Sequence, residues 1–237
     1  MCLISIAHHA SKFPLVLAAN RDELYARPTR PAHQWEDDPR VIGGRDLRAG
    51  GSWLAVRKGG RFAAVTNVRR VGREEGGPSR GLLVSEFIRG DDSPTAYAPS
   101  IRGEDYAGFH LIVGDGDIVH RSNATPVESI EGLFAISNAP PGAHWPKVDL
   151  AREFLAGAIE RNKTADDLAN DLLRFLSTPR GAPIDREVFV TSSAYGTRSS
   201  TVIIIDADGE VLFVEQNYGL KGVRDGAAVR FQLPSRS

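Results

Sequence analysis

The sequence predicts an α+β fold built of layers of sheet and helix. Strand patterns fill both ends of the 237-residue chain, whereas the two longest amphipathic helices follow one another in its second half. This order favours an α+β layered fold over a repeating βαβ one. No internal repeat, low-complexity tract or linker interrupts the chain, so we expect a single domain over residues 1–237.

The amino-terminal third is predicted to form strands joined by turns. The first strand alternates two sets of side chains, and the second is a continuous apolar run typical of a buried strand. Pro28 and Pro31 predict a loop, and glycines between 43 and 52 predict irregular structure. Gly59-Gly60 predicts a hairpin between the last two strands. These strands are expected at residues 2–8, 15–19, 53–57 and 62–67.

Helices and hairpins are predicted to alternate in the rest of the chain. A polar, glycine-rich loop at 69–80 precedes a helix that follows Ser79, and Asp115-Gly116 is a strong hairpin signal. Thr164 has the position of a helix N-cap, with Asp167 three residues later. The other helices are expected within 93–101, over 147–161 and from Thr164 to Leu176, and the strands at 109–113, 118–120, 133–137, 187–191, 201–206, 211–215 and 229–233.

Composition narrows the function classes. A net charge of −1 argues against a nucleic-acid partner, because such proteins usually carry a basic excess. The single cysteine excludes an intramolecular disulfide and suits a reducing compartment. No apolar run approaches the roughly 18–20 residues of a membrane span, and the amino terminus lacks a signal-peptide pattern. We therefore expect a cytoplasmic protein without a membrane span, and the oligomeric state stays open.

Cys2, the only cysteine, is the first candidate catalytic residue. Removal of Met1 by an aminopeptidase would leave Cys2 with a thiol nucleophile and an α-amino group that can act as its general base. If Met1 is retained, that base is lost and Cys2 is an ordinary thiol. The competing interpretation is structural, because lone cysteines are often buried and behave as small hydrophobes.

Polar clusters follow several predicted strands and provide candidate partners for the sulfur. Arg21 or Arg198 would favour a nearby thiolate. Asn67 and Asn138 each follow an apolar strand and could donate hydrogen bonds to a developing oxyanion. The alternatives are local turns for the asparagines and solvated ion pairs for the charged residues.

These motifs in their order resemble the NRDE family, also called the transport and Golgi organisation protein 2 family. The likeness runs from residue 1 to about residue 220. That family in turn resembles N-terminal nucleophile hydrolases of the choloylglycine hydrolase and penicillin V acylase type. The resemblance implies a four-layer αββα sandwich of two antiparallel sheets. The matching motifs are Met1-Cys2-Leu3-Ile4, Asn20-Arg21-Asp22-Glu23, Gly51-Ser52-Trp53-Leu54-Ala55, Val65-Thr66-Asn67, Ser137-Asn138 through Trp145-Pro146-Lys147-Val148, and Tyr195-Gly196-Thr197-Arg198-Ser199-Ser200-Thr201.

The resemblance implies a role for five residues. Cys2 matches the nucleophile, and Arg21 is similar to the arginine beside the thiol. Asn67 and Asn138 resemble the two asparagines of the oxyanion hole, and Arg198 resembles a late structural arginine.

The acid that orients the amine departs from the hydrolase pattern. Those enzymes place an aspartate three residues after the arginine, where this chain has Leu24. Asp22 or Glu23 would have to take that role with a shifted backbone, so the choice between them stays open.

Two function classes follow. The first is an N-terminal cysteine hydrolase or acyl transferase that acts on an amide or thioester of a small acylated molecule and requires no cofactor. The second is a non-enzymatic carrier that binds haem or acyl-CoA or lipid in the same cleft, because the resembled family is associated with haem trafficking and lipid metabolism. Whether the protein is an enzyme at all is left open at this point.

The carrier class has its own candidate residues. Arg69, Arg70, Arg73 and Arg80 would bind the phosphates of acyl-CoA, although Glu74 and Glu75 make a solvated loop the simpler interpretation. No histidine pair has metal-ligand spacing, and no metal site is predicted. Adjacent His8 and His9 are expected to face opposite ways on a strand. The candidate haem ligands are Cys2, His8, His9, His33, His110, His120 and His144.

Overall fold

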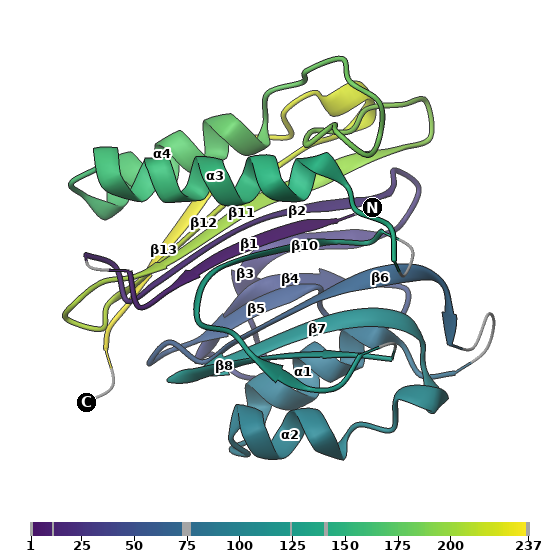
Figure 1. The fold of residues 1–237 in the computed structure, drawn as a ribbon, viewed down its shortest axis with the longest axis vertical. Helices are drawn as coiled ribbons and strands as arrows, with labels where there is room; N and C mark the ends of the chain where they lie inside the picture. The colour runs from purple at the N-terminus through teal and green to yellow at the C-terminus, as the bar shows by residue number, and fades with distance from the viewer. Residues whose placement is uncertain (1, 11, 73–76, 124, 140–141, 236–237) are drawn as a thin grey trace.

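A computed structural model describes residues 2–10, 12–72, 77–123, 125–139 and 142–235, and for 69–72 it describes the backbone alone. Two antiparallel sheets are stacked face to face, and a pair of helices covers the outer face of each sheet (Figure 1). The four-layer αββα arrangement implied by the resemblance is confirmed.

The first sheet contains the amino-terminal strand β1 next to its edge strand β10. Its six strands run in the order β10, β1, β2, β11, β12, β13, so segments far apart in the sequence become neighbours. Helices α3 and α4 cover this sheet. The bounds are β1 Leu3–His8, β2 Leu15–Leu24, β10 Gly132–Ser137, α3 Pro146–Arg161, α4 Ala165–Leu176, β11 Tyr195–Ile205, β12 Val211–Asn217 and β13 Val229–Leu233.

The second sheet is a meander in which each strand pairs with the next along the chain. Helices α1 and α2 are inserted after its fourth strand and cover its outer face. The bounds are β3 Thr29–Gln34, β4 Val41–Asp46, β5 Leu54–Arg57, β6 Phe62–Gly72, α1 Arg80–Arg89, α2 Pro94–Ser100, β7 Ala107–Asp115, β8 Asp117–Ser122 and β9 Glu128–Ser129. Short 3₁₀ turns occur at Gly103–Asp105 and Leu220–Gly222.

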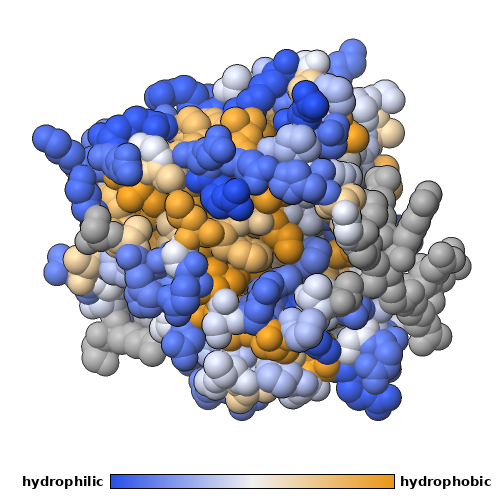
Figure 2. All heavy atoms as spheres, viewed as in Figure 1, coloured by the Kyte–Doolittle hydropathy of each residue, from blue (hydrophilic) through white to orange (hydrophobic). Residues whose placement is uncertain are grey.

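Three apolar layers hold the sandwich together. Leu155 of α3 packs against the outer face of the first sheet, Ile6 and Phe213 pack between the sheets, and Phe87 of α1 packs on the second sheet. Each large apolar side chain buried in this way contributes roughly 1.5–3 kcal/mol. Hydrophobic residues gather across the middle of the molecule between the two helical layers (Figure 2).

The turn and cap predictions from local sequence are confirmed. Gly59 and Gly60 have φ of 87° and 89° in the turn between β5 and β6, and Gly116 has φ of 88° between β7 and β8. The side chain of Thr164 accepts a hydrogen bond from the backbone N–H of Asp167 at the start of α4.

The strand predicted at 187–191 is wrong. This segment is buried, but its amides bind side chains instead of a neighbouring strand. The N–H of Phe189 donates to Glu187 Oε1, and the N–H of Val190 donates to Thr197 Oγ1 at 2.9 Å. Only an isolated bridge between Thr191 and Gly196 remains, and β11 begins at Tyr195, before the predicted residue 201.

Three segments predicted as loop or irregular structure form strands instead. The proline-containing segment is edge strand β3, a place where a missing N–H costs no ladder hydrogen bond. The glycine-rich segment contains β4, and β6 continues to Gly72. The remainder of the predicted 69–80 loop includes residues 73–76, which lie outside the described residues.

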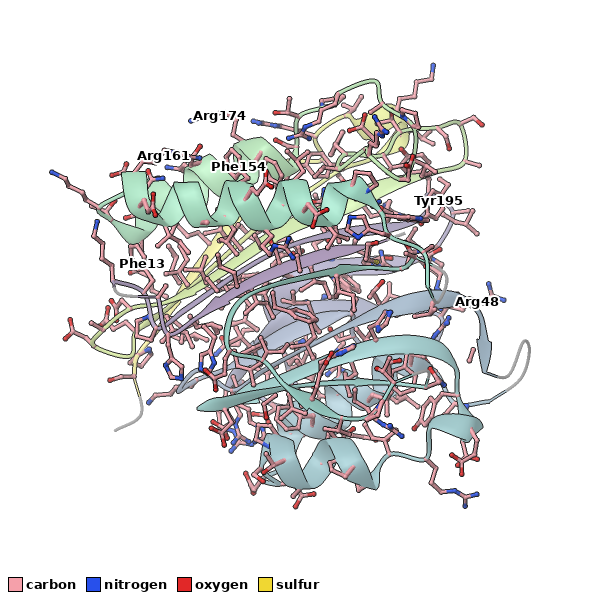
Figure 3. All side chains as sticks on the ribbon, in the orientation of Figure 1. Phe13, Arg48, Phe154, Arg161, Arg174 and Tyr195 are labelled. Atoms are coloured by element: carbon pink, nitrogen blue, oxygen red, sulfur yellow. The ribbon has the colours of Figure 1, made fainter. Side chains whose placement is uncertain are left out.

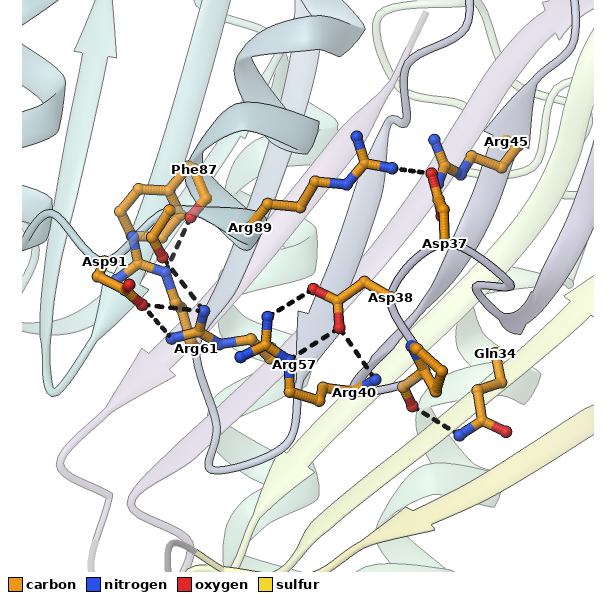
Figure 4. A network of polar contacts seen from close by, with 12 residues as sticks. Gln34, Asp37, Asp38, Arg40, Arg45, Arg57, Arg61, Phe87, Arg89 and Asp91 are labelled. Atoms are coloured by element: carbon orange, nitrogen blue, oxygen red, sulfur yellow. Dashed lines mark hydrogen bonds and ion pairs between the residues drawn. The ribbon is translucent and has the colours of Figure 1, made fainter.

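A polar network fixes α1 against the second sheet (Figure 4). Arg61 is fully buried, and its guanidinium donates to the carbonyl oxygens of Phe87 and Asp92 and pairs with Asp115. Asp37 pairs with two arginines, Arg45 and Arg89. These contacts hold the carboxyl end of α1 and so set the position of its amino end, which borders the cleft described below.

No helix among the described residues combines the length and the apolar character that a bilayer crossing requires.

Candidate active site

The register of the first sheet brings the predicted nucleophile beside two of its predicted partners. Leu3 begins β1 and pairs with the last residue of β10 and with Asn20 of β2. One residue earlier, the same antiparallel register sets Cys2 between Asn138 and Arg21. Directly opposed residues in such a pair have Cβ atoms about 4.5–5.5 Å apart. Three segments distant in sequence therefore meet at the end of β1.

Alternation along the strands decides which side chains share a face. Ile4 and Ala19 point into the core between the sheets. Cys2 and Arg21 lie two residues from them and so belong to the same inner face. Asp22 belongs to the opposite face, which is covered by α3 and α4. The sulfur and the guanidinium thus look toward the second sheet, and the Asp22 carboxyl looks toward the helices.

The inner-face residues open into a cleft of about 650 Å³ at this end of the sandwich. Arg48, which lines the cleft, and Tyr195 lie at the same end of the molecule, opposite to Phe13 (Figure 3). Cys2 is half-buried and reaches the cleft, so its sulfur is not sealed in the interior. The lining residues are Cys2, Arg21, Asp22, Glu23, Arg27, Asp46, Arg48, Ala49, Ser52, Trp53, Val65, Asn67, Gly77, Pro78, Ser79, Arg80, Gly81 and Ala107.

Arg21 is held rigidly beside Cys2. Its guanidinium carbon lies 4.1 Å from the centroid of a ring of Trp53, and the side chain is 7% exposed. Such a cation–π contact both orients and stabilises the cation. Gly44 makes the stack possible, because a Cβ there would lie 2.1 Å from the Trp53 ring.

Three cationic side chains interact electrostatically with Cys2. Burial lowers the pKa values of Arg21, Arg80 and Lys147, and in each case the charge of Cys2 acts in the opposite direction. A negative sulfur is therefore attracted by all three groups at once.

Asp22 is buried and contacts the helix-side face of the sheet. Thr197 Oγ1 donates to its carboxyl at 2.7 Å, and the Tyr195 hydroxyl donates to its backbone carbonyl. Burial raises the pKa of Asp22, while the charge of the amino terminus, the Thr197 hydrogen bond and the charges of Lys147 and Arg21 oppose that rise. Glu23 lines the cleft as Asp22 does, and its carboxylate accepts from the N–H of Leu24. Met1 itself lies outside the described residues.

The two predicted oxyanion residues have different environments. Asn67 lies on β6, is exposed and lines the cleft. Asn138 follows β10, is 3% exposed and does not line the cleft. Its Oδ1 has no hydrogen-bond partner within the described part of the chain. An unsatisfied amide oxygen costs free energy when buried, so Asn138 is a group in need of a partner.

Arg198 lies away from the sulfur and supports the backbone. It occupies the bulge in β11, and its Nη1 donates to the carbonyl oxygens of Leu24, Tyr25 and Arg27. It lines a separate cavity of about 80 Å³ that also touches Arg21. This environment agrees with the structural role that the resemblance implies.

The amino end of α1 forms one wall of the cleft. The N–H of Ser52 donates to Gly81 O at 3.1 Å, and a Cβ on Gly51 would lie 2.3 Å from the Gly81 carbonyl carbon. Only glycine allows two backbones to approach so closely. Arg80 is fixed on this wall by donation to Gly108 O. Of the other arginines predicted to bind phosphate, Arg69, Arg70 and Arg73 have no described side chains.

Sequence reasoning gave no site role to two residues that shape the electrostatics. Lys147 is 1% exposed on α3, and its Nζ donates to Glu187 O at 3.4 Å. Trp53 is the platform for Arg21. Both residues belong to the motifs that resemble the NRDE family. That position in the motifs was the sequence signal that could have identified them as site residues. Their burial and contacts depend on segments more than 30 residues away.

A buried carboxyl between the sheets gives a prediction about pH. Glu215 accepts hydrogen bonds from Ala32 N and Thr201 Oγ1, and burial raises its pKa. A raised pKa means that ionisation opposes folding, so its contribution to stability is lost as pH rises through the folded-state pKa. We expect Glu215→Gln to gain stability relative to the native chain as the pH rises from 4 to 8, measured by urea unfolding. Exposed Glu210→Gln should show no such pH dependence, and a constant difference for Glu215→Gln would contradict the prediction.

The candidate haem ligands lie in different parts of the structure, and the prediction that His8 and His9 face opposite ways is wrong. No histidine is among the described residues that line the cleft, which leaves Cys2 as the one predicted ligand there. His110 and His120 hydrogen-bond to each other, and burial lowers the pKa of His110 to about 4. His8 and His9 do not face opposite ways. β1 ends at His8, and the positive φ of 58° at His9 folds its ring onto that of His8, with centroids 3.7 Å apart.

The part of the sequence that contains the site is similar to a known protein family. Residues 1–219 match the family described as Transport and Golgi organisation 2. The chain belongs to that family. It is 34% identical to the Transport and Golgi organization protein 2 homolog of Bos taurus over 239 aligned positions, which cover 86% of this chain and 87% of that protein. The human homolog is 31% identical with the same coverage. The resemblance seen in the sequence is confirmed.

Solved structures similar to this Transport and Golgi organisation 2 member share its fold. One is the Caenorhabditis elegans N-acylethanolamine-hydrolyzing acid amidase ortholog, with a TM-score of 0.54, 14% identity and coverage of 86% of this chain and 92% of that chain. Another is the C2A mutant of the conjugated bile acid hydrolase from Clostridium perfringens, with a TM-score of 0.56, 7% identity and coverage of 98% and 92%. The fold is therefore that of N-terminal nucleophile hydrolases.

Proposed function

We propose that this protein is an N-terminal cysteine hydrolase or acyl transferase that cleaves an amide or thioester of a small acylated molecule. The observation that carries the proposal is the position of Cys2. It is half-buried at the mouth of the cleft, next to Arg21 in the sheet register and within the field of three cations. The shared fold with an acid amidase and a bile acid hydrolase supports this reaction class.

The reaction has two steps. After loss of Met1, the Cys2 amine accepts the thiol proton, and the sulfur attacks the acyl carbon to form a C–S bond. The C–N or C–S bond to the leaving group then breaks, and the amine returns the proton to that group. Water, or an acceptor alcohol, amine or thiol, attacks the acyl-cysteine and regenerates the thiol. Asn138 and Asn67 are the candidate donors to the oxyanion in both steps.

The polarity of the cleft suggests a substrate with an anionic group. Arg48 and Arg80 both line the wall formed by α1 and the loop before β5. Arg27 is already paired with Asp46 at 2.6 Å, whereas Arg80 donates to a backbone carbonyl and keeps further N–H groups for a ligand. Arginine binds carboxylate and phosphate through two parallel hydrogen bonds. A phosphate- or carboxylate-bearing acyl donor fits this wall better than a plain hydrocarbon.

The same wall supports a second candidate, a carrier that binds an acyl-CoA-like anion without chemistry. The two candidates differ in what they require of Cys2. A carrier would keep its affinity and make no covalent intermediate. The haem variant of the carrier would have to use Cys2, since histidines are absent from the described lining.

Labelling of Cys2 tests the enzyme proposal before any substrate is known. Intact mass should show loss of Met1, and iodoacetamide at pH 7 should modify Cys2 at least ~10-fold faster than a free thiol, since the adjacent α-amino group can take up the thiol proton. Arg21→Met should slow the reaction, and Arg174→Met on the far helix α4 is the matched control. Retained Met1 with an unreactive Cys2 would instead support the carrier.

A further inference from the structure

A second cluster of reactive side chains lies at the opposite end of β1. His8 Nδ1 and His9 Nε2 each lie 3.8 Å from Glu131 Oε2. The two imidazole rings are stacked with centroids 3.7 Å apart and planes inclined by 27°. One ligand atom from each of the three residues falls within 4.8 Å of the others. The three potential ligand atoms are thus close together, and the exposed His9 ring would have to turn out of the stack for both imidazoles to point at one ion.

Both ring nitrogens of His8 face backbone carbonyl oxygens. Nδ1 lies 3.0 Å from Ile130 O, and Nε2 lies 3.1 Å from Gly116 O. Both carbonyl oxygens are acceptors, but a neutral imidazole has one N–H. The ring nitrogen that carries no hydrogen therefore presents a lone pair, which is the group that binds a metal ion. The His8 side chain is 6% exposed, so water does not readily take this place.

The orientation of His8 suits a metal better than a proton. Metal-ligating histidines usually donate their other ring N–H to a carbonyl or carboxylate, which fixes the tautomer. Gly116 O provides that partner for Nε2, and Nδ1 is then left unprotonated beside Ile130 O and Glu131. His9 and Glu131 are 68% and 72% exposed and can close onto an ion without disturbing the core.

The sandwich holds the three residues in place. His8 pairs with Gly132 of β10 and Leu15 of β2 in the sheet register. The N–H of His9 donates to Pro14 O at 2.9 Å, which fixes the turn after β1. Glu131 directly precedes β10. The ligands therefore come from the ends of two paired strands.

We propose that His8, His9 and Glu131 bind one zinc-class divalent ion. Two nitrogen ligands and one oxygen ligand suit Zn²⁺ and disfavour Ca²⁺ and Mg²⁺, which prefer oxygen. Tetrahedral Zn²⁺ ligands at about 2.0–2.1 Å from the metal lie about 3.3 Å apart. The two separations from Glu131 Oε2, 3.8 Å each, require a shift of roughly half an ångström, which exposed Glu131 can make, and the two histidine nitrogens lie within 4.8 Å of each other before His9 turns. A cavity of about 480 Å³ beside His8 and His9 gives a fourth ligand access to the ion.

This site is independent of the Cys2 cleft. Cys2 and His8 are six residues apart on an extended strand, which is about 20 Å. A free thiolate also binds zinc, so the decisive titrations are made in the Cys2→Ala chain. Loss of the sulfur removes a competing ligand and leaves the three proposed ligands untouched.

The test is calorimetric titration of the full chain with Zn²⁺, together with the absorption spectrum of the Co²⁺ form. We expect one ion per chain and d–d bands typical of a tetrahedral nitrogen and oxygen environment. His9→Ala and Glu131→Gln should each weaken Zn²⁺ binding by at least ~10-fold. Because both side chains are exposed, we expect both variants to fold, and an unchanged melting temperature without metal verifies this.

The matched control is His144→Ala, which removes an equally exposed histidine that is also paired with a carboxylate, Asp149. Its affinity for Zn²⁺ should equal that of the parent chain. The proposal is overturned if the parent chain shows no saturable binding, if His9→Ala and Glu131→Gln bind as the parent does, or if His144→Ala weakens binding to the same extent.

Discussion

Cys2→Ala should lower the kcat/KM for hydrolysis of amides and thioesters by at least ~10³-fold, because it removes the atom that forms the acyl intermediate. The side chain is small and half-buried, so the fold should persist. The measurement is product release from a panel of N-acyl amides and acyl thioesters, with and without an anionic group. Cys2→Ser should be nearly as inactive, since a hydroxyl is a far weaker nucleophile than a thiolate.

Turnover distinguishes the two function classes in the same variant, because both classes predict that binding is retained. Cys2→Ala should bind a substrate with the affinity of the native chain, because Arg21 and Arg80 are unchanged. Ser5→Ala is a control for general effects on β1. Ser5 lies on the same strand, and its buried hydroxyl donates to Ala18 O of β2. Full turnover by Cys2→Ala would refute the hydrolase proposal.

Asn138→Ala is expected to lower kcat by about 10²–10³-fold with little change in KM, which is the usual cost of losing one oxyanion donor. The side chain neighbours Cys2 in the register, and its Oδ1 lacks a partner among the described residues. The hydrogen bond to the oxyanion would come from the Nδ2–H group of this amide. Steady-state kinetics at saturating substrate measure the effect.

Two further asparagines make the experiment specific. Asn67→Ala tests the exposed cleft residue in parallel, and its effect relative to Asn138→Ala tells which amide contributes more. Asn170→Ala on the exposed face of α4 should leave kcat unchanged. An unaltered kcat for Asn138→Ala, with the melting temperature preserved, would remove this residue from the mechanism.

Local signals in the sequence predicted the features that local interactions determine. Thr164 caps α4 through its own side chain, and Gly116 supplies the positive φ of a tight turn. These features depend on a few neighbouring residues. The order of the layers was implied by the family resemblance, since the pairing of β1 with β10 joins segments about 130 residues apart.

The failures came from tertiary context. Segment 187–191 has the apolar composition of a strand, but Glu187 and Thr197 side chains bind its amides. The strand at 29–34 contains Pro31 and forms because it pairs with β4 at the edge of the second sheet. The chain leaves the strand at His9 through a positive φ, which no local sequence signal predicts.

The sequence predicted which residues belong to the site better than it predicted the contacts that surround them. The motif around Arg21 identified the cation beside Cys2, but the Trp53 ring beneath it comes from another sheet. Nothing local distinguishes Arg198, which binds backbone carbonyls, from Arg21. The burial of Lys147 depends on contact with Glu187, 40 residues later.

The strand register also decides how the protein should be handled for these measurements. Leu233 of β13 is linked through Val211, Ile205 and Leu15 to His8, so the last strand exits at the end of the sandwich remote from the sulfur (Figure 1). A purification peptide fused ahead of Cys2 would occupy the mouth of the cleft and block the amine. The same peptide after Leu233 would spare the cleft but emerge near His8 and His9, so it should contain no histidine.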